Sequence, residues 1–325
     1  MNLADVKAYL GEDWTNTEKK IRESLFSNVP LLSETNEKLL RHPGKQLRPI
    51  LCLLIARACG SGKVTDDTIK YAATAEILHN ATLLHDDVAD ASDERRGEPT
   101  INALMGPSIS VLLGDFWLVK AMDCVMSVEG SESVTNLYKD TLLHLAEGEM
   151  FQLQKASSGD TDLEDYLKII YDKTASLFDA VACSACISVG ASEEVKAKMR
   201  IYAKNLGLAF QMRDDIFDYS TGLDTGKPVL NDILERKITL PLLGAFKNSP
   251  SLEKLWRDKL TLADDLSGLR MEVLDYVKDN GGLEYAQNML ESYIGEAISA
   301  LDILDETKER EILKNLATYV GKRLF

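Results

Sequence analysis

The sequence predicts an all-α protein that folds as a single domain. Apolar residues recur at three- and four-residue spacing along most of the 325 residues, which is the period of an amphipathic helix. No segment alternates apolar and polar residues convincingly, as a half-buried strand would. Glycine and proline gather in connections that are too short to mark a domain boundary. We therefore expect one helical bundle over residues 1–325.

The predicted helices begin with one that starts at Thr65 and runs to about Asp90, because Thr65 is followed by two acidic residues, as an N-cap often is. Thr161 and Ser192, each also followed by acidic residues, resemble two further helix starts. Apolar periodicity sets the remaining bounds. The other helices are predicted over roughly 107–128, 131–155, 161–189, 192–220, 238–247, 252–260, 263–280, 283–303 and 306–322.

The composition is that of an acidic globular protein. The apolar fraction of 45% predicts a sizeable core, and the formal net charge of −15 argues against nucleic-acid binding. No run of about 18 uncharged apolar residues occurs, so no membrane span is predicted. Acidic residues interrupt the N-terminal segment, which argues against a signal peptide. The five cysteines, an odd number in apolar stretches, predict reduced thiols and a cytoplasmic location.

Two of the cysteines, Cys183 and Cys186, have the spacing of a redox or zinc motif. No second pair and no nearby histidine accompany them. Free cysteine commonly behaves as a small buried apolar residue. We favour that interpretation over a metal or redox role.

The acidic pattern D-D-x-x-D occurs twice, each time where a predicted helix ends. The two copies are Asp86, Asp87 and Asp90, and Asp214, Asp215 and Asp218. The first and last carboxylates of each copy share a helix face, repel each other and lie at the unfavourable end of the helix dipole. Mg²⁺ prefers such oxygen ligands and usually also binds substrate phosphate. The pattern predicts a metal-bridged phosphate site built from two helices that face each other.

Basic residues accompany the acidic motifs. They are Lys45 and Arg48, Arg95 and Arg96, Lys173, Lys227, and Lys237. Arginine binds phosphate with a planar fork and lysine as a point charge, so the mixture suits two diphosphates in different modes. Simpler explanations exist for single elements: a solvated acidic face, an arginine pair that neutralises Asp93 and Glu94, or a core histidine at His79. The joint occurrence is harder to explain in that way.

Together these residues lie in segments that resemble those of the trans-isoprenyl diphosphate synthases, also called polyprenyl synthetases. GKQLRP is similar to the family's GKRLRP, and ILHNATLLHDDVADASDERRGEPTIN to its first aspartate-rich region. GDFWLVKA, EGEMFQL, DKTASLF, FQMRDDIFDY and GKPVLNDILERKITLPLL match further family segments in order. The resemblance covers nearly the whole chain. It implies the isoprenoid-synthase helical bundle around a central deep cavity.

The resemblance also implies an activity: Mg²⁺-dependent condensation of isopentenyl diphosphate, head to tail, with an allylic diphosphate primer, by ionisation, condensation and elimination. It implies three Mg²⁺ ions with substrate bound, a proton taken by the released diphosphate, and a homodimer. By position, Asp86, Asp90 and Asp214 would ligate the metal. Asp87, Asp215 and Asp218 would be further catalytic carboxylates.

The resemblance assigns the substrate contacts residue by residue. Arg95, Lys173, Lys227 and Lys237 would hold the allylic diphosphate, with Lys173 counted among the catalytic residues. Lys45, Arg48, His79 and Arg96 would hold isopentenyl diphosphate, and Thr174 and Gln211 would support the allylic cation. One departure is Gln46, where many relatives carry arginine.

Product length is expected to depend on the helix below Asp86. The residues there are Thr74, Ala75, Leu78, Ala81 and Thr82. Short-chain members of the family often place bulky aromatic residues just below the motif, whereas this chain has small ones. We therefore expect a long all-trans product of octaprenyl type. The alternatives are a short-chain farnesyl or geranylgeranyl diphosphate synthase, a terpene cyclase, and a non-catalytic acidic metal-binding subunit.

Overall fold

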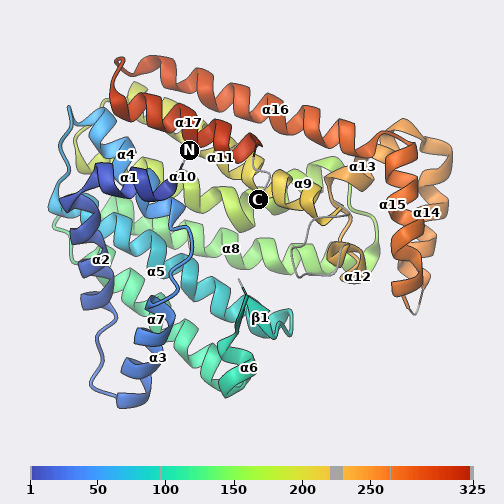
Figure 1. The fold of residues 1–325 in the computed structure, drawn as a ribbon, viewed down its shortest axis with the longest axis horizontal. Helices are drawn as coiled ribbons and strands as arrows, with labels where there is room; N and C mark the ends of the chain where they lie inside the picture. Colours follow the sequence, from blue (N-terminus) through green and yellow to red (C-terminus); the bar gives the residue numbers. More distant parts are fainter. Residues whose placement is uncertain (1, 96, 220–229, 264, 323–325) are drawn as a thin grey trace. The chain divides into compact units, whose positions relative to one another are not determined.

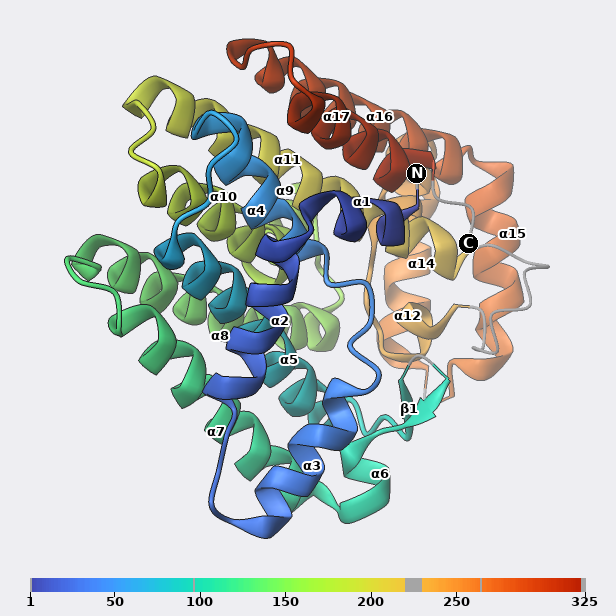
Figure 2. The same cartoon turned by 60° about the vertical axis from the view of Figure 1, so that its left-hand side comes forward.

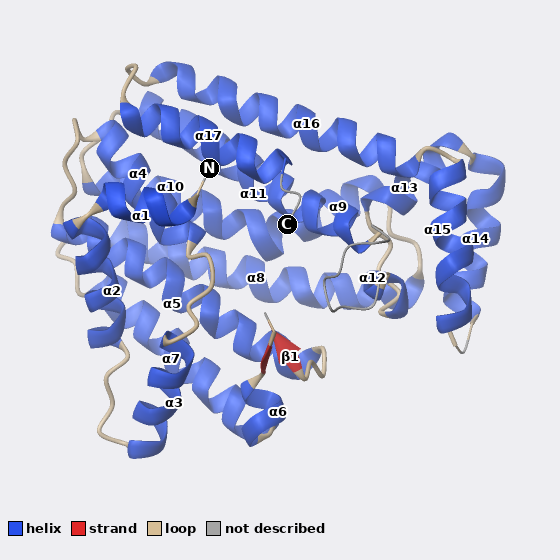
Figure 3. Cartoon of the chain, viewed as in Figure 1, coloured by secondary structure: helices blue, strands red, loops and turns tan. Residues whose placement is uncertain are grey.

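The computed structural model describes residues 2–95, 97–219, 230–263 and 265–322, and these are almost entirely helical (Figure 3). The all-α prediction is confirmed. The chain divides into two compact units. Unit 1 comprises Met1–Lys139, Ala180–Arg200 and Ile303–Leu313, and unit 2 comprises Asp140–Asp179, Ile201–Asp302 and Lys314–Phe325. The single domain and its central cavity stay predictions.

Unit 1 is built mainly from the N-terminal helices (Figure 1). They are α1 (Leu3–Leu10), α2 (Glu12–Ser24), α3 (Pro30–Leu40), α4 (Leu47–Cys59), α5 (Asp66–Ala89), α6 (Ile101–Met105) and α7 (Pro107–Met126). The α5 and α7 bounds agree with the prediction. Thr65 caps α5 as expected, because its hydroxyl accepts a hydrogen bond from the Thr68 N–H at 3.1 Å. Apolar periodicity did not delimit α1 to α4 or the short α6.

A small hairpin, which the all-α prediction did not include, follows α5. Strands β1 (Glu94–Arg95) and β2 (Glu98–Pro99) are antiparallel, and Arg95 pairs with Glu98. Gly97, in the connection, has a φ of 79°, which glycine adopts without strain. Strands of two residues carry no recognisable alternation, so periodicity could not predict them.

The core of unit 1 forms around α4, α5 and α7. Ile50 to Ala56 of α4 are fully buried, so this helix is apolar on all sides. Helices α5 and α7 lie side by side (Figure 2). A Cβ at Gly114 of α7 would lie 2.4 Å from Nε2 of His85, so a larger residue there would require the His85 ring of α5 to move. The helix that carries the first acidic motif is therefore held against α7 at its C-terminal end.

Unit 2 holds most of the C-terminal half. Its elements are α9 (Leu163–Ile170), a π-helix η1 (Tyr171–Ala175), α12 (Asn231–Leu234), α13 (Leu240–Asn248), α14 (Pro250–Leu262), the 3₁₀ turn η2 (Ser267–Leu269), α15 (Arg270–Asp279) and α16 (Gly282–Ala300). Both units receive residues from α8 (Glu132–Ser158), α10 (Ser176–Ser188), α11 (Glu193–Asp218), the 3₁₀ turn η3 (Leu301–Ile303) and α17 (Lys308–Lys322).

Two predicted helices of this half differ from the structure. The helix expected over 161–189 consists of α9, η1 and α10 in succession. Its N-cap is Asp162 rather than the neighbouring Thr161, and the Asp162 carboxylate accepts a hydrogen bond from the Asp165 N–H at 2.8 Å. The one expected over 263–280 begins as η2 and becomes α-helical only at Arg270. Ser192 does lie at a helix start, where its hydroxyl accepts from the Val195 N–H at 3.3 Å.

The cysteines are free thiols. Cys183 and Cys186 are buried in α10, which confirms the packing interpretation. One contact was not predicted from the sequence. Sγ of Cys186 lies 4.0 Å from Sγ of Cys59 at the end of α4. Among the described residues, no helix is both long enough and apolar enough to cross a membrane.

Candidate active site

The first acidic motif occupies the last turn of α5 in unit 1. The Asp90 N–H donates to the Asp86 carbonyl at 2.8 Å, so helical geometry persists to the end of the motif and places the two residues on one face. Asp86 is half-buried and Asp90 is exposed, whereas Asp87 is only 4% exposed. The outer two carboxylates are therefore accessible to a cation, and the middle one is turned into the protein.

Arg95 lies beside this motif. From β1, its Nε donates to Oδ1 of Asp87 at 2.7 Å. The simpler explanation was that Arg95 neutralises Asp93 or Glu94. In the structure Arg95 instead forms an ion pair with the buried Asp87. Arg96 lies outside the described residues.

The GKQLR segment forms a left-handed turn before α4. Gly44 has a φ of 69°, and Gln46 has a φ of 54° and a ψ of 44°. The left-handed region costs a non-glycine residue about 1–2 kcal/mol, so surrounding contacts must hold it. Lys45 and Arg48, on either side of Gln46, are half-buried. His79 is also half-buried, on α5, which packs against α4.

The residues expected to gauge product length lie along α5. Thr74, Ala75, Leu78 and Ala81 are buried, and Thr82 is half-buried. The Thr74 hydroxyl lies 2.9 Å from the Lys70 carbonyl and 3.5 Å from that of Ala121 on α7. The Thr82 hydroxyl donates to the His79 carbonyl at 2.8 Å. Both hydroxyl groups are thus used within the helix pair.

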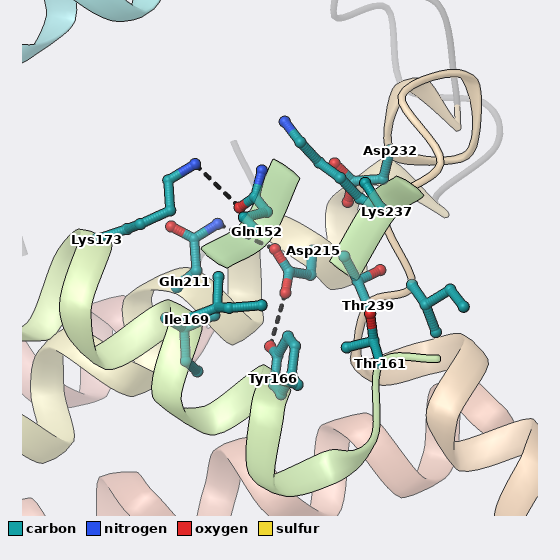
Figure 4. A pocket seen from close by; sticks show the side chains of 13 residues that line it. Gln152, Thr161, Tyr166, Ile169, Lys173, Gln211, Asp215, Asp232, Lys237 and Thr239 are labelled. Atoms are coloured by element: carbon teal, nitrogen blue, oxygen red, sulfur yellow. Dashed lines mark hydrogen bonds between the residues drawn. The ribbon is translucent and has the colours of Figure 1, made fainter. Parts of the chain in front are cut away.

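Unit 2 contains a polar cavity of about 130 Å³ (Figure 4). Pockets for drug-sized ligands have volumes of about 300–1,000 Å³, so this one suits a small polar group rather than a long chain. The predicted residues that line it are Lys173, Gln211, Asp215 and Lys237. The lining residues that sequence reasoning gave no role are Gln152, Ala156, Thr161, Tyr166, Ile169, Ile170, Asp232, Ile238 and Thr239.

Asp215 is the buried carboxylate of this cavity. Its oxygens accept hydrogen bonds from the Tyr166 hydroxyl at 2.6 Å and from Nε2 of Gln211 at 3.0 Å (Figure 4). Burial raises the pKa of Asp215 to about 6, although the two hydrogen bonds oppose the rise. Gln211 also accepts from the Thr174 hydroxyl at 3.0 Å. The second acidic motif is thereby connected to the predicted cation-supporting residues.

Two further acids near Asp215 have raised pKa values. Burial raises the pKa of Asp218, although it accepts from the backbone N–H groups of Asn231 and Asp232, both at 2.9 Å. Burial, followed by the charges of Asp215 and Asp218, raises the pKa of Asp232 well above its usual range. Crowded carboxylates of this kind favour a nearby cation. Lys237 supplies one, and it pairs with Glu235. Lys227 lies outside the described residues.

Lys173 and Thr174 are presented by the π-helix η1. π-helical turns are rare and frequently occur at functional sites. Gly148 of α8 lies close against this turn, where a Cβ would lie 2.7 Å from Cβ of Asp172. Asp172 is 1% exposed and binds Nδ1 of His144 at 2.8 Å. The packing directs Nζ of Lys173 to Oε1 of Gln152 at 2.9 Å and to Glu149.

The donor chemistry fits magnesium. Asp86, Asp90 and the exposed Asp214 offer oxygen ligands at helix ends. Within the described ranges, no group of three or more histidine, cysteine, aspartate or glutamate side chains is placed to hold a metal ion. Mg²⁺ usually takes one or two carboxylates and completes its shell with water and substrate phosphate. In each unit, taken by itself, these carboxylates are of the type that binds a magnesium ion together with a phosphate group.

Tyr166 and Asp232 carried weaker sequence signals. Tyr166 precedes Lys173 by two helical turns, so spacing alone placed both on one face. Asp232 follows the second motif, among the segments that accompany it and that the family resemblance covers, but we assigned it no role from the sequence. The fold, which buries both side chains beside Asp215, identifies them.

We expect the melting temperature of the unliganded protein to rise as the pH falls through 6. The folded-state pKa of Asp215, about 6, exceeds its ordinary 3.8, so the folded state binds a proton that the unfolded state does not. The cost of ionising this buried group, on the order of 2–3 kcal/mol, is fully present above pH 6 and is relieved toward pH 4. Thermal unfolding at several pH values between 7.5 and 4.5 measures this change in melting temperature.

The Asp215→Asn variant should show a shallower pH dependence, because asparagine does not titrate. The exposed Asp258→Asn serves as control, since it removes the same formal charge in unit 2. Equal slopes in all three proteins would contradict the assignment to Asp215.

Comparisons with known proteins cover the whole chain. The family model described as Polyprenyl synthetase matches residues 29–271. The chain is 37% identical over 325 residues to the octaprenyl diphosphate synthase of Escherichia coli (strain K12), with 99% of each chain covered. It is 36% identical over 321 residues to the all-trans-nonaprenyl-diphosphate synthase (geranyl-diphosphate specific) of Rhodobacter capsulatus, with 98% of each covered. A solved structure, a decaprenyl diphosphate synthase from Rhodobacter capsulatus, superposes with a TM-score of 0.92 at 33% identity over 100% of both chains.

Proposed function

Because this chain belongs to the polyprenyl synthetase family, we propose that it is a trans-prenyltransferase that extends an allylic diphosphate with isopentenyl diphosphate. One observation carries the proposal. Lys173, Lys237 and the second acidic motif meet at one polar cavity, in a chain that is similar over its whole length to synthases of long polyprenyl diphosphates. The cavity suits a diphosphate group, since it combines cationic donors with carboxylates that favour a further cation.

The allylic diphosphate binds, in this proposal, to Lys173 and Lys237 in unit 2 and to Arg95 beside the first motif. The ammonium of Lys173 contacts Gln152 and Glu149, so it is oriented before substrate arrives. Such preorganised donors stabilise charge more strongly in the transition state than in the ground state, because the leaving diphosphate gains charge as the C–O bond breaks. In the proposal, Thr174 and Gln211, which are hydrogen-bonded to each other, support the carbon that becomes positive.

Asp86, Asp90 and Asp214 would hold Mg²⁺, up to three ions with substrate bound, and the metal would supply Lewis-acid stabilisation of the same leaving group. Asp215 remains turned toward Tyr166 and Gln211 and orients the helix end rather than contacting solvent. Asp218 binds the backbone at the start of α12, so the second motif also fixes the segment that carries Lys237. In this proposal Asp215 and Asp218 have structural roles, so only the other aspartates need to be accessible to Mg²⁺.

Isopentenyl diphosphate is assigned to Lys45, Arg48 and His79 of unit 1. A second diphosphate held without metal needs direct cationic donors, and the turn before α4 offers two of them close together. The α5 helix carries both His79 and the first acidic motif, so the two substrate sites share one rigid element. The proton lost after condensation goes to the released diphosphate.

An assay with Mg²⁺, labelled isopentenyl diphosphate and an allylic primer tests the activity. The expected result is Mg²⁺-dependent incorporation, and chromatography of the products should give chains from hexaprenyl to decaprenyl, centred on octaprenyl. Farnesyl or geranylgeranyl diphosphate as the main product would overturn the long-chain proposal. A cyclic hydrocarbon, or no incorporation at all, would overturn the prenyltransferase proposal itself.

The Ala81→Phe substitution should shorten the product. Ala81 is fully buried on α5, one to two turns before Asp86, where a phenyl ring would occupy the path that we assign to the growing chain. Overpacking a buried site costs about 1–3 kcal/mol, so the melting temperature must be measured as well. Ala197→Phe, at an exposed position of unit 1, is the matched control. An unchanged product length in a folded Ala81→Phe protein would place the chain elsewhere.

We also propose a homodimer. Helix α7 exposes Leu112, Val119 and Met126, which are spaced by seven residues and therefore form one apolar stripe. A second copy of the chain would cover this stripe and remove it from water. Light scattering after size-exclusion chromatography should give the mass of a dimer, and Val119→Glu should yield monomers. A monomeric wild-type protein at micromolar concentration would contradict the dimer.

A reducing compartment, the cytoplasm, fits the chemistry of the thiols. Cys59 and Cys186 are free, and their sulfur atoms lie 4.0 Å apart. A reducing compartment would keep this pair as thiols. Cell fractionation tests this location.

A further inference from the structure

We infer that Lys7 is a positioning residue: it binds Gln46 and thereby holds the left-handed turn that presents Lys45 and Arg48. The inference rests on the proposed function, because it concerns the site assigned to isopentenyl diphosphate. It also gives a reason for the amide at position 46.

The contact joins α1 to the start of α4. Nζ of Lys7 donates to Oε1 of Gln46 at 2.7 Å, between residues 39 positions apart in the chain. Gln46 is 7% exposed, so water does not compete effectively for its carbonyl oxygen. The ammonium also lies 4.5 Å from the centroid of the Trp14 ring, at cation–π distance. Lys7 is therefore held from two sides.

The turn at Gln46 needs such a contact. Its backbone lies in the left-handed region, which a non-glycine residue adopts only when neighbouring groups hold it there. Gln46 occupies the N-cap position of α4, yet its side chain makes no capping hydrogen bond. The amide is thus committed to Lys7 instead of the helix end. Because Lys45 precedes Gln46 directly and Arg48 follows two residues later, rotation about the Gln46 backbone would redirect both side chains.

Helix α1 is itself anchored to α4. Arg57, in the last turn of α4, donates from NH2 to the Leu10 carbonyl at 2.6 Å and from Nε to Oδ2 of Asp13 at 2.8 Å. Leu10 lies one turn beyond Lys7 on the same helix. The position of Lys7 relative to α4 is therefore set by a second contact that does not involve Gln46. The helix that carries Lys7 is thus held in place independently of the contact with Gln46.

The identity of residue 46 follows from this pairing. The similar family segment GKRLRP has arginine at this position. A guanidinium group has donors only, so it could not accept the hydrogen bond from Lys7 and would place a like charge beside it. Glutamine supplies the acceptor. Burial lowers the pKa of Lys7 while the charges of Glu18 and Glu76 raise it, so the ammonium lies in a partly buried site with two carboxylates near it.

A double-mutant cycle tests the pairing. The proteins are the wild type, Lys7→Gln, Gln46→Arg, and the double variant, which exchanges donor and acceptor and leaves the net charge unchanged. The KM for isopentenyl diphosphate, the KM for the allylic primer and the melting temperature without ligands are measured for each. Lys19→Gln is the control, because it removes a lysine of the adjacent α2 whose side chain is 73% exposed.

We expect each single substitution to raise the KM for isopentenyl diphosphate about fivefold and to leave the KM for the primer within about twofold. The double variant should recover most of the loss in both KM and melting temperature. The control should match the wild type. This selective effect distinguishes positioning from a general loss of stability, which would raise both KM values.

The inference is overturned if the single variants leave the KM for isopentenyl diphosphate unchanged, or if the effects of the two substitutions multiply without recovery. If Gln46→Arg does not fold, the cycle of Lys7→Met and Gln46→Met replaces it. If the wild type makes no prenyl diphosphate, the proposed function fails. The melting temperatures then decide the Lys7–Gln46 coupling, because they need no substrate.

Discussion

Replacing Asp86 with asparagine is expected to lower kcat about a hundred- to a thousandfold. Asparagine keeps the shape of the side chain but removes the negative charge, so it binds Mg²⁺ weakly and leaves the charge on the departing diphosphate poorly compensated. The accessible position of Asp86 in the last turn of α5 makes a large loss of stability unexpected. Steady-state kinetics over a Mg²⁺ titration measure the effect, and the Mg²⁺ concentration for half-maximal rate should rise.

The matched control is Asp66→Asn. Asp66 is exposed in the first turn of the same helix, so the substitution removes the same charge far from the motif. A protein-only measurement complements the kinetics: stabilisation against heat by Mg²⁺ with inorganic diphosphate should be reduced in Asp86→Asn and retained in Asp66→Asn. Wild-type activity in Asp86→Asn would remove the first motif from the mechanism.

The second large effect is expected at Lys173. The substitution Lys173→Gln keeps a polar side chain beside Gln152 but removes the cation from the cavity. A hydrogen bond to a charged group contributes about 1.5–3 kcal/mol, so kcat/KM for the allylic primer should fall about 10- to 150-fold. The KM for isopentenyl diphosphate should change little, since that substrate is assigned to Lys45 and Arg48.

Lys254→Gln controls for the loss of a positive charge in unit 2, because Lys254 is exposed and pairs only with its neighbour Asp258 among the ion pairs of the described residues. An equal rise in both KM values would show that Lys173 stabilises the protein rather than one substrate. No change in either would exclude Lys173 from the site.

Much of the site was predictable because it is local in the sequence. Each acidic motif ends a long apolar-periodic segment, and the structure places Asp90 and Asp218 at the ends of α5 and α11. The family itself was also predicted correctly, since seven ordered segments carry the resemblance and the family model covers most of the chain. Periodicity and motif order are properties that a single sequence displays directly.

Contacts between distant segments were not predictable in this way. Tyr166 binds Asp215 across 49 residues, and Lys7 binds Gln46 across 39. No spacing rule relates such residues, because their proximity depends on how helices pack. Arg95 illustrates the same limit, since nearby acids in the sequence suggested Asp93 or Glu94 although the partner is the buried Asp87. Burial decided the partner, and burial is a property of the folded chain.

The π-helix escaped prediction for another reason. Its sequence, YDKTA, continues the helical pattern of its neighbours, so the sequence does not distinguish a π-helical turn from an α-helical one. The turn packs against Gly148 of α8, where a Cβ would lie 2.7 Å from Cβ of Asp172. This close contact joins segments more than 20 positions apart, so local periodicity does not reveal it.

The same turn makes the protein sensitive to changes in chain length at one point. A π-turn accommodates an extra residue within a continuous helix, and each residue of an α-helix turns the chain by about 100°. Loss of a single residue from Tyr171–Ala175 would restore a regular α-helix and rotate α9, with Tyr166, away from Asp215. Insertions and deletions are usually harmless in surface loops. Here the enzyme carries, inside a helix, a position where the number of residues matters as much as their identity.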